Sequence, residues 1–226
     1  MQFLRLLTED ELQRLRRQVV FRRFRKGQVV FHQGDESDGF YTVWNGCVAV
    51  SVSEADGGGR LLQMVARGES IGEVSMLEGR VRPVTATARE ASTLAFLSRR
   101  DFQELLTARP ELSVAIVSML SANFGRLRAK FADSVALDVP TRLAKLMLEL
   151  QQRHAAPDIE LKKRSLRFSQ RELAEMLSVS RVWVSRELNR WRGAGIVELR
   201  RGRLIVCDHA ALARLANAKD LSPDTV

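Results

Sequence analysis

The chain has 226 residues, a formal net charge of +9 and 45% hydrophobic residues. This length suffices for two domains with separate cores, and this composition excludes a disordered chain. No apolar run approaches the roughly 18 residues of a membrane span, and the N-terminus lacks the apolar core of a signal peptide. We therefore expect a cytoplasmic protein. Its two distant cysteines, Cys47 and Cys207, fit no disulfide framework or metal cluster.

Residues 27–98 contain short alternating segments separated by turn sequences such as Asn45-Gly46. Their even spacing predicts an antiparallel β-roll or jelly-roll barrel. Before this region, Thr8 and Glu11 form a predicted capping box that opens a short helix. The predicted strands cover residues 29–31, 40–44, 47–52, 60–65 and 93–97.

Between Arg99 and Leu137 the apolar period changes to 3.6, which indicates helices. We predict one long helix over about 111–136, roughly 40 Å in length at 1.5 Å per residue. One small barrel cannot cover such a helix. We therefore interpret its stripe as a coiled-coil seam between two subunits, in preference to a helix that only bridges two domains. The stripe comprises Leu112, Ile116, Leu120, Phe124 (or Asn123), Leu127, Phe131 and Val135.

From Asp138 onward the pattern predicts helices and then a short extended segment. Asp138 can cap a helix whose first turn holds Pro140, a combination that starts helices cleanly. Ser169 and Glu172 form a capping box for the next helix. Ser180 caps the helix after that, following a short turn, and two helices at this spacing predict a helix-turn-helix.

The helix after Ser180 has two distinct faces. Val184, Leu188 and Trp191 share an apolar stripe that would pack on the preceding helix. The opposite face carries side chains that can bond bases and phosphates in a major groove. Residues 196–208 then predict a hairpin wing with a basic tip. The predicted DNA contacts are Ser169, Gln170, Ser180, Arg181, Val182, Ser185, Arg186, Asn189, Arg201 and Arg203.

Basic charge is concentrated in this part of the chain. Residues 162–203 hold twelve basic and four acidic residues, a net charge of +8. Such a concentration is typical of a module that binds double-stranded DNA. The alternative is a small helical subdomain with a solvated basic face. We favour DNA binding because the charge, the helix caps, the helix spacing and the wing agree.

Several motifs, in this order, resemble those of the CRP/FNR superfamily of bacterial transcription regulators. GQVVFHQGDESDGFYTVWNGCVAV, residues 27–50, resembles the opening segment of its barrel. GESIGEVSMLEGRVRPVTATA, residues 68–88, resembles its phosphate-binding cassette. LDVPTRLAKLML, residues 137–148, resembles its hinge and following helix, and residues 168–191 resemble its helix-turn-helix. The resemblance covers about residues 3–215.

This resemblance implies an α+β protein in three parts. They are a cyclic-nucleotide-binding-like sensor domain over residues 1–109, a dimerisation helix over 110–137 and a winged helix-turn-helix over 138–226. It also implies a cytoplasmic, non-enzymatic homodimer that binds a near-palindromic double-stranded DNA site and contacts RNA polymerase. The sensor state would pass through the dimer helix and the hinge at Asp138–Pro140 to set DNA affinity.

The resemblance also suggests a ligand site in the cassette. In cyclic-AMP-binding members a glutamate bonds the ribose, an arginine grips the phosphate, and a following Ser or Thr adds a phosphate contact. Gly72, Glu73 and Arg82 match the first positions, but Pro83 has neither a hydroxyl nor an N–H. Leu127 and Arg128 stand where those members place a Thr-Ser pair. At about 1–3 kcal/mol per lost contact, we expect cyclic AMP to bind weakly in its usual pose.

Three alternatives stay open for this cassette. Glu73 and Arg82 could form an internal ion pair that holds it folded. Arg80, Arg82 and Arg128 would instead suit a larger anion such as cyclic di-GMP. An enzyme acting on a phosphorylated or cyclic-nucleotide substrate is the third, although no nucleophile–base pair, metal-ligand cluster or P-loop accompanies the pocket.

Residue types also bear on other ligands and on the DNA target. Two distant cysteines cannot hold an iron–sulfur cluster. His32 stands in a turn, where a structural role is favoured over haem ligation, and Cys47 in an alternating strand suits a core position. Val182 stands where many family members have a glutamate that accepts from a cytosine amino group. We therefore predict a DNA target that differs from the TGTGA half-site.

Overall fold

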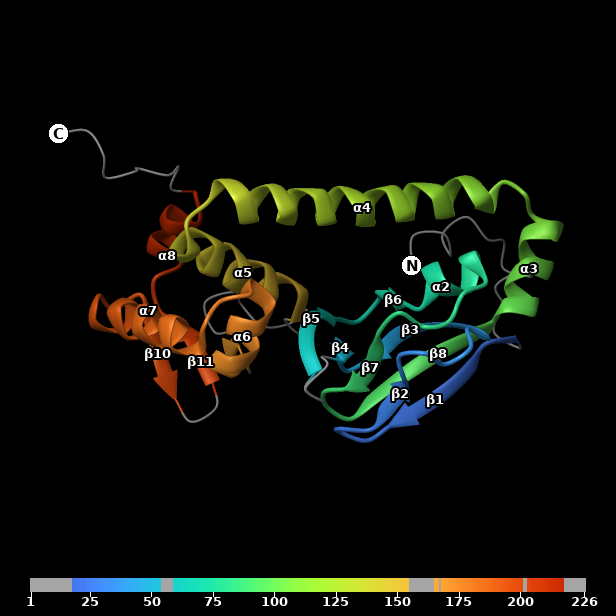
Figure 1. Cartoon of the computed structure of the whole chain (residues 1–226), viewed down its shortest axis with the longest axis horizontal. Coiled ribbons are helices and arrows are strands. Elements are labelled where there is room, and N and C mark those ends of the chain that lie inside the picture. The colour runs from blue at the N-terminus through green and yellow to red at the C-terminus, as the bar shows by residue number, and fades with distance from the viewer. Residues whose placement is uncertain (1–17, 54–58, 155–164, 167, 201–202, 218–226) are drawn as a thin grey trace. The chain divides into compact units, whose positions relative to one another are not determined.

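The chain forms two compact units, residues 1–125 and 126–226, and the division falls within one helix, α4 (Leu112–Ala136) (Figure 1). The α+β class is confirmed, because helices and antiparallel sheets both occur. The predicted boundaries at 109/110 and 137/138 remain predictions. The computed structural model describes residues 18–53, 59–154, 165–166, 168–200 and 203–217, so the capping box at Thr8 and Glu11 lies outside it.

Two four-stranded sheets build the first unit, and every strand pair in them is antiparallel. The first sheet contains, in order, β1 (Val20–Phe24), β8 (Ser92–Ser98), β3 (Gly39–Asn45) and β6 (Ser70–Ile71). The second contains β2 (Val29–Phe31), β7 (Thr85–Ala88), β4 (Val48–Ser53) and β5 (Gly59–Val65). This arrangement confirms the predicted β-roll and all five predicted strands.

Alternate side chains of both sheets meet in one core. Tyr41, Val43 and Leu94 enter it from the first sheet, and Val48 and Ala86 enter it from the second. Strands β1, β6 and β7 were not predicted. β1 carries two arginines and β6 has only two residues, so neither displays an alternating apolar pattern.

A second core cluster joins the roll to the helices of the first unit. It combines Met76 of α2 (Glu73–Glu78), Phe102 of α3 (Arg99–Ala108), and Leu112 and Ile116 of α4. Leu120 is half-buried and packs against the same cluster. The start of α4 is therefore anchored to its own sensor unit.

The predicted long helix is confirmed as α4, but the single apolar stripe assigned to it is wrong. Leu112 and Ile116 are buried in the first unit, whereas the stripe residues further along the helix are exposed. Val114 and Val117, which were left out of the stripe, are exposed as well. The helix thus has a buried face in its first turns and a separate exposed apolar face. The exposed apolar residues of α4 are Val114, Val117, Phe124, Leu127, Phe131 and Val135.

The second unit is a helical domain with a small three-stranded sheet. Its helices after α4 are α5 (Val139–His154), α6 (Gln170–Leu177), α7 (Arg181–Gly193) and α8 (His209–Ala216). The sheet order is β10 (Val197–Arg200), β11 (Arg203–Val206) and β9 (Ser165–Leu166). Leu143, Leu173, Leu188, Trp191 and Leu212 are among its fully buried side chains. Within the described ranges, no helix is long and apolar enough to cross a membrane.

Candidate DNA-binding surface and sensor pocket

Helices α6 and α7 are set by three serines, two of which were predicted as caps. Ser169 accepts from the N–H of Glu172, whose carboxylate accepts in return from the Ser169 N–H at 2.7 Å, so the predicted capping box is confirmed. The hydroxyl of Ser180 accepts from the N–H of Trp183, which confirms the second cap. Between them, Ser178 adopts a left-handed conformation at φ 57°. This residue ends α6 and allows the sharp turn into α7.

The predicted inner face of α7 is also confirmed. Val184, Leu188 and Trp191 are fully buried, and α6 and α7 pack together. Glu187 is buried too, and its carboxylate pairs with Arg190. One of the four arginines of this helix is therefore neutralised within it, which was not predicted.

The predicted recognition face is turned to solvent. Arg181, Val182, Arg186 and Asn189 are exposed, and Ser185 is half-buried. Within the described part of the chain, neither arginine makes a hydrogen bond or an ion pair. Guanidinium and amide groups left free at the start of an exposed helix can bond base edges in a major groove.

Two further predicted DNA contacts, Ser169 and Ser180, also cap helices of the domain. The Ser169 hydroxyl donates to Glu172 at 2.8 Å, so its hydrogen is engaged in the cap. Ser180 uses only its acceptor in capping, which leaves its hydrogen free for a phosphate. Gln170 is the first residue of α6 and is half-buried.

The wing is a two-stranded hairpin, as the sequence predicted. Residues Val197–Arg200 pair with Arg203–Val206, with Arg200 opposite Arg203. Arg200 is bound to Glu198, whereas Arg203 is exposed and has no partner in the described ranges. Arg201 lies outside the described residues. The wing therefore offers at least one free cation beside the hairpin turn.

The start of α5 has the predicted cap. The Asp138 carboxylate accepts from the N–H of Thr141 at 2.9 Å, and Pro140 stands in the first turn. Two ion pairs then join the end of α4 to α5. Lys145 bonds Asp133 at 2.8 Å, and Lys130 bonds Glu149 at 3.2 Å. These two pairs therefore connect the segments before and after the predicted hinge at Asp138–Pro140.

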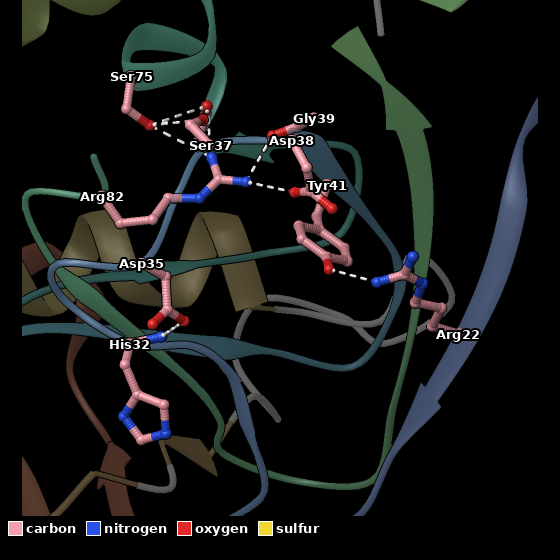
Figure 2. A network of polar contacts seen from close by, with 10 residues as sticks. Arg22, His32, Asp35, Ser37, Asp38, Gly39, Tyr41, Ser75 and Arg82 are labelled. Atoms are coloured by element: carbon pink, nitrogen blue, oxygen red, sulfur yellow. Dashed lines mark hydrogen bonds and ion pairs between the residues drawn. The ribbon is translucent and has the colours of Figure 1, made fainter. Parts of the chain in front are cut away.

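Arg82 is the centre of the sensor site. Its residue surface is only 1% exposed, and four hydrogen bonds hold its guanidinium (Figure 2). Nη1 donates to the carbonyl of Gly72 at 2.9 Å and to the hydroxyl of Ser75 at 3.2 Å. Nη2 donates to the carbonyl of Gly39 at 2.6 Å and to the carboxylate of Asp38 at 3.3 Å. Its Nε is buried and has no partner among the described residues.

The electrostatics of this site follow from burial. Desolvation lowers the pKa of Arg82, and the carboxylate of Asp38 opposes that shift. The guanidinium stays charged, because arginine is not deprotonated in proteins. It also lies over the ring of Phe31, 4.5 Å from the centroid, which stabilises the cation from one face.

The ion pair between Glu73 and Arg82, one of the alternatives left open for the cassette, does not form in the described part of the chain. Within the described ranges, Glu73 forms no ion pair, and the carboxylate that contacts Arg82 belongs to Asp38. Desolvation raises the pKa of Glu73, and a backbone hydrogen bond and, to a smaller extent, the charge of Arg82 oppose this only in part. Glu73 is half-buried, and no side chain of the described ranges forms an ion pair with it. Asp38 was missed because it stands 44 residues before Arg82, in a segment that carries only turn signals.

Gly72 is required where Arg82 approaches the cassette. Its φ is +83°, and a Cβ atom built there would lie 2.3 Å from Nη1 of Arg82. The other predicted ligand residues, Arg80 and Arg128, are exposed and have no partner among the described residues, Arg80 after α2 and Arg128 on α4. Over the described residues, no group of three or more His, Cys, Asp or Glu could hold a metal ion.

Cys47 is buried in the roll and Cys207 is exposed, and neither forms a disulfide. His32 is exposed in the turn after β2, where its backbone N–H donates to the carboxylate of Asp35 at 2.8 Å.

Two family matches cover most of the chain. Residues 21–109 match the cyclic nucleotide-binding domain, and residues 141–215 match the Crp-like helix-turn-helix domain. The chain is 27% identical over 193 residues to the CRP-like cAMP-activated global transcriptional regulator of Mycobacterium tuberculosis, covering 85% of this chain and 86% of that protein. It is 28% identical over 198 residues to the cyclic AMP receptor protein of Thermus thermophilus, covering 86% and 87% of the two chains.

A solved structure supports the same fold. The c-di-GMP responsive global regulator CLP of Xanthomonas campestris matches with a TM-score of 0.73 over 89% of this chain and all of that chain, at 24% identity. At this identity the likeness concerns the fold alone. The two domain matches, the two relatives and the helix-turn-helix geometry agree. This chain belongs to the CRP/FNR superfamily and is a DNA-binding transcription regulator with a cyclic-nucleotide-binding sensor domain.

Proposed function

We propose that this regulator acts as a cytoplasmic homodimer that places one α7 helix of each subunit in the major groove of a near-palindromic DNA site. The observation that carries this proposal is the free, exposed pair Arg181 and Arg186 at the start of α7. Asn189 continues the same surface, and Arg203 adds a phosphate contact from the wing. At a promoter the bound dimer would contact RNA polymerase, and it has no catalytic role of its own.

The exposed face of α4 supports the dimer. Val114, Val117, Phe124, Phe131 and Val135 repeat at intervals of three and four residues, or their sums. This is the a/d pattern of a two-stranded coiled coil, and large apolar residues in one exposed row mark an interface. In this register Ser121 and Arg128 complete the seam. A polar residue at an inner position favours one register and one number of strands.

For the sensor pocket we propose a small anion that also carries hydroxyl groups, with a cyclic nucleotide as the first candidate. Glu73 supports this class, because a half-buried carboxylate whose desolvation is only partly offset is stabilised further by hydroxyl donors. Arg82 fits an anion, since it is buried, charged and held in position. Its free Nε adds one donor that no described residue uses.

An effector phosphate would have to replace Asp38. Of the four bonds of the Arg82 guanidinium, only this one joins it to a charged group, and the Asp38 side chain is 65% exposed. Asp38 is largely exposed and contacts Arg82 through one oxygen at 3.3 Å, so a phosphate that bonds arginine in two places can displace it. Pro83 supplies no phosphate contact, so we propose weak binding of cyclic AMP. Cyclic di-GMP, with Arg80 as a further cation, is the second candidate.

The test is equilibrium binding of the full-length protein to a duplex selected from a random pool. Binding is measured at two salt concentrations, without ligand, with cyclic AMP and with cyclic di-GMP. We expect a palindrome other than TGTGA to be enriched. Arg186→Ala should weaken binding to that palindrome by about 1–3 kcal/mol while leaving non-specific binding almost unchanged.

The matched control is Arg100→Gln, which removes an exposed arginine from the sensor unit and should leave DNA binding as it is. An equal loss on all duplexes would mean that Arg186 touches only phosphate. A pool without any enriched sequence would refute the proposed DNA readout. A tenfold effect of cyclic AMP, about 1.4 kcal/mol, would show that Pro83 does not prevent tight binding.

A further inference from the structure

The outer surface of the first sheet carries a hollow that neither the DNA-binding surface nor the sensor pocket uses. Successive side chains of a strand point to opposite faces of a sheet. On β3 and β8, Val43 and Leu94 enter the core, and their neighbours Trp44 and Thr93 therefore face outward. The hollow measures about 570 Å³ and is open to solvent. It is lined by Phe21, Arg23, Trp44, Asn45, Arg67 and Thr93.

Two aromatic rings form one side of this hollow. Phe21 is 51% exposed and Trp44 is 57% exposed, although both are large apolar side chains. Their ring centroids lie 5.4 Å apart with the planes at 80°, an edge-to-face pair that holds both rings in place. A preorganised indole in water is a stacking platform, because each base of a nucleic acid presents a flat π-face.

The charge around the rings is positive. Arg23 and Arg67 are exposed, and neither forms a hydrogen bond or an ion pair within the described part of the chain. None of the described residues that line the hollow carries a carboxylate. Thr93 lies between Arg23 of β1 and Asn45 of β3, because it is paired in register with both, so two hydrogen-bonding side chains stand beside the cation.

We propose that this hollow binds a nucleoside phosphate, at a site separate from the sensor pocket. The base would stack on Trp44, and the phosphate would lie between Arg23 and Arg67. The hydroxyl of Thr93 and the amide of Asn45 would bond the sugar or the edge of the base. A flat ring with an attached anion matches this combination of aromatic surface and unpaired guanidinium groups, and the volume lies within the usual range of small-molecule sites.

The experiment is calorimetric titration of the full-length protein with 5′-AMP as the probe. Adenosine, which lacks the phosphate, and ribose 5-phosphate, which lacks the base, are titrated separately. We expect each of these to bind at least tenfold more weakly than 5′-AMP. Trp44→Ala should also weaken 5′-AMP binding tenfold or more, or about 1.4 kcal/mol, and Trp44→Phe should restore most of it. Arg67→Gln should weaken 5′-AMP and leave adenosine unchanged.

Two control variants separate this site from others. Arg100→Gln removes an exposed arginine elsewhere on the same unit, and Glu73→Gln alters the sensor pocket. Both should bind 5′-AMP at the hollow as the wild type does. Because Trp44 is exposed, its variants should fold, which circular dichroism checks.

The proposal would be overturned if Trp44→Ala bound 5′-AMP with the affinity of the wild type. It would also be overturned if the wild type showed no saturable binding of 5′-AMP with a Kd below about 1 mM. Binding of a short single-stranded oligonucleotide through Trp44, without binding of 5′-AMP, would overturn it in favour of a nucleic-acid strand. Loss of binding in Glu73→Gln alone would assign the nucleotide to the sensor pocket instead.

Discussion

Replacing Gly72 by alanine tests whether Arg82 holds the sensor cassette folded. Two separate penalties are expected. The first is the left-handed backbone at φ +83°, which costs an L-residue about 1–2 kcal/mol. The second is the collision of the new Cβ with Arg82, 2.3 Å from Nη1 and 3.1 Å from Cζ. The guanidinium must then move and lose at least one charge-assisted hydrogen bond, about 1.5–3 kcal/mol.

The assay is urea unfolding of the full-length protein. Gly68→Ala is the matched control, because Gly68 has a similar φ of +85° but nothing lies within 4 Å of its Cβ position. We expect a loss of about 3–5 kcal/mol for Gly72→Ala and about 1–2 kcal/mol for Gly68→Ala. In an Arg82→Met background the extra penalty should largely disappear, as a double-mutant cycle would show. Equal losses for the two glycines would refute the role assigned to Arg82.

Four further outcomes are expected. Burial raises the pKa of Glu73, so the stability that this side chain contributes is present at low pH and is lost as the pH rises through its folded pKa. Glu73→Gln should therefore raise the midpoint of thermal unfolding at about pH 7 but not at about pH 3. Asp38→Asn should strengthen the binding of an anionic effector, measured by calorimetry, because it removes the competing carboxylate. Trp191→Ala should lower the free energy of unfolding by about 3–5 kcal/mol and abolish DNA binding, since Trp191 fills the core behind α7. Phe131→Glu should weaken the dimer at least tenfold in sedimentation equilibrium, whereas Ala132→Glu on the same helix should not, because only Phe131 belongs to the exposed seam.

The helix-turn-helix could be predicted almost completely from the sequence. Its helix start signals are local, since the hydroxyls of Ser169 and Ser180 each accept a hydrogen bond from the backbone N–H three residues further on. Its inner face follows from helical periodicity alone. What the sequence did not reveal is the neutralisation of Arg190, because Glu187 was expected neither to be buried nor to pair with it.

The stripe on α4 was misread for a geometric reason. Residues spaced by four advance about 40° around a helix with each step, so a long row of such positions drifts from one face to another. Leu112 and Ile116 thus face the sensor core, whereas Phe131 and Val135 do not. A three-four alternation compensates for the drift, and it links Val114 and Val117 to the exposed face instead.

The sensor site depends on contacts that no local pattern encodes. Asp38 and Gly39 stand just before and at the start of β3, and they reach Arg82 only because the roll folds β3 against the cassette. Matching Glu73 and Arg82 to a family motif identified the two charged residues. It could not show which carboxylate contacts the arginine, since that choice is made by three-dimensional proximity.

The bonds of Arg82 suggest how an anion can act on the sensor without building a new site. Three of its four bonds go to groups that cannot leave, namely the carbonyls of Gly39 and Gly72 and the hydroxyl of Ser75. They tie the start of β3 to α2, so the guanidinium stays in place when Asp38 is displaced. The effector's binding free energy then includes only the difference between its own bonds to Arg82 and the bond that Asp38 makes. Because Asp38 is exposed, we expect this difference to favour a phosphate, and we expect the segment before β3 to be the part of the sensor that changes.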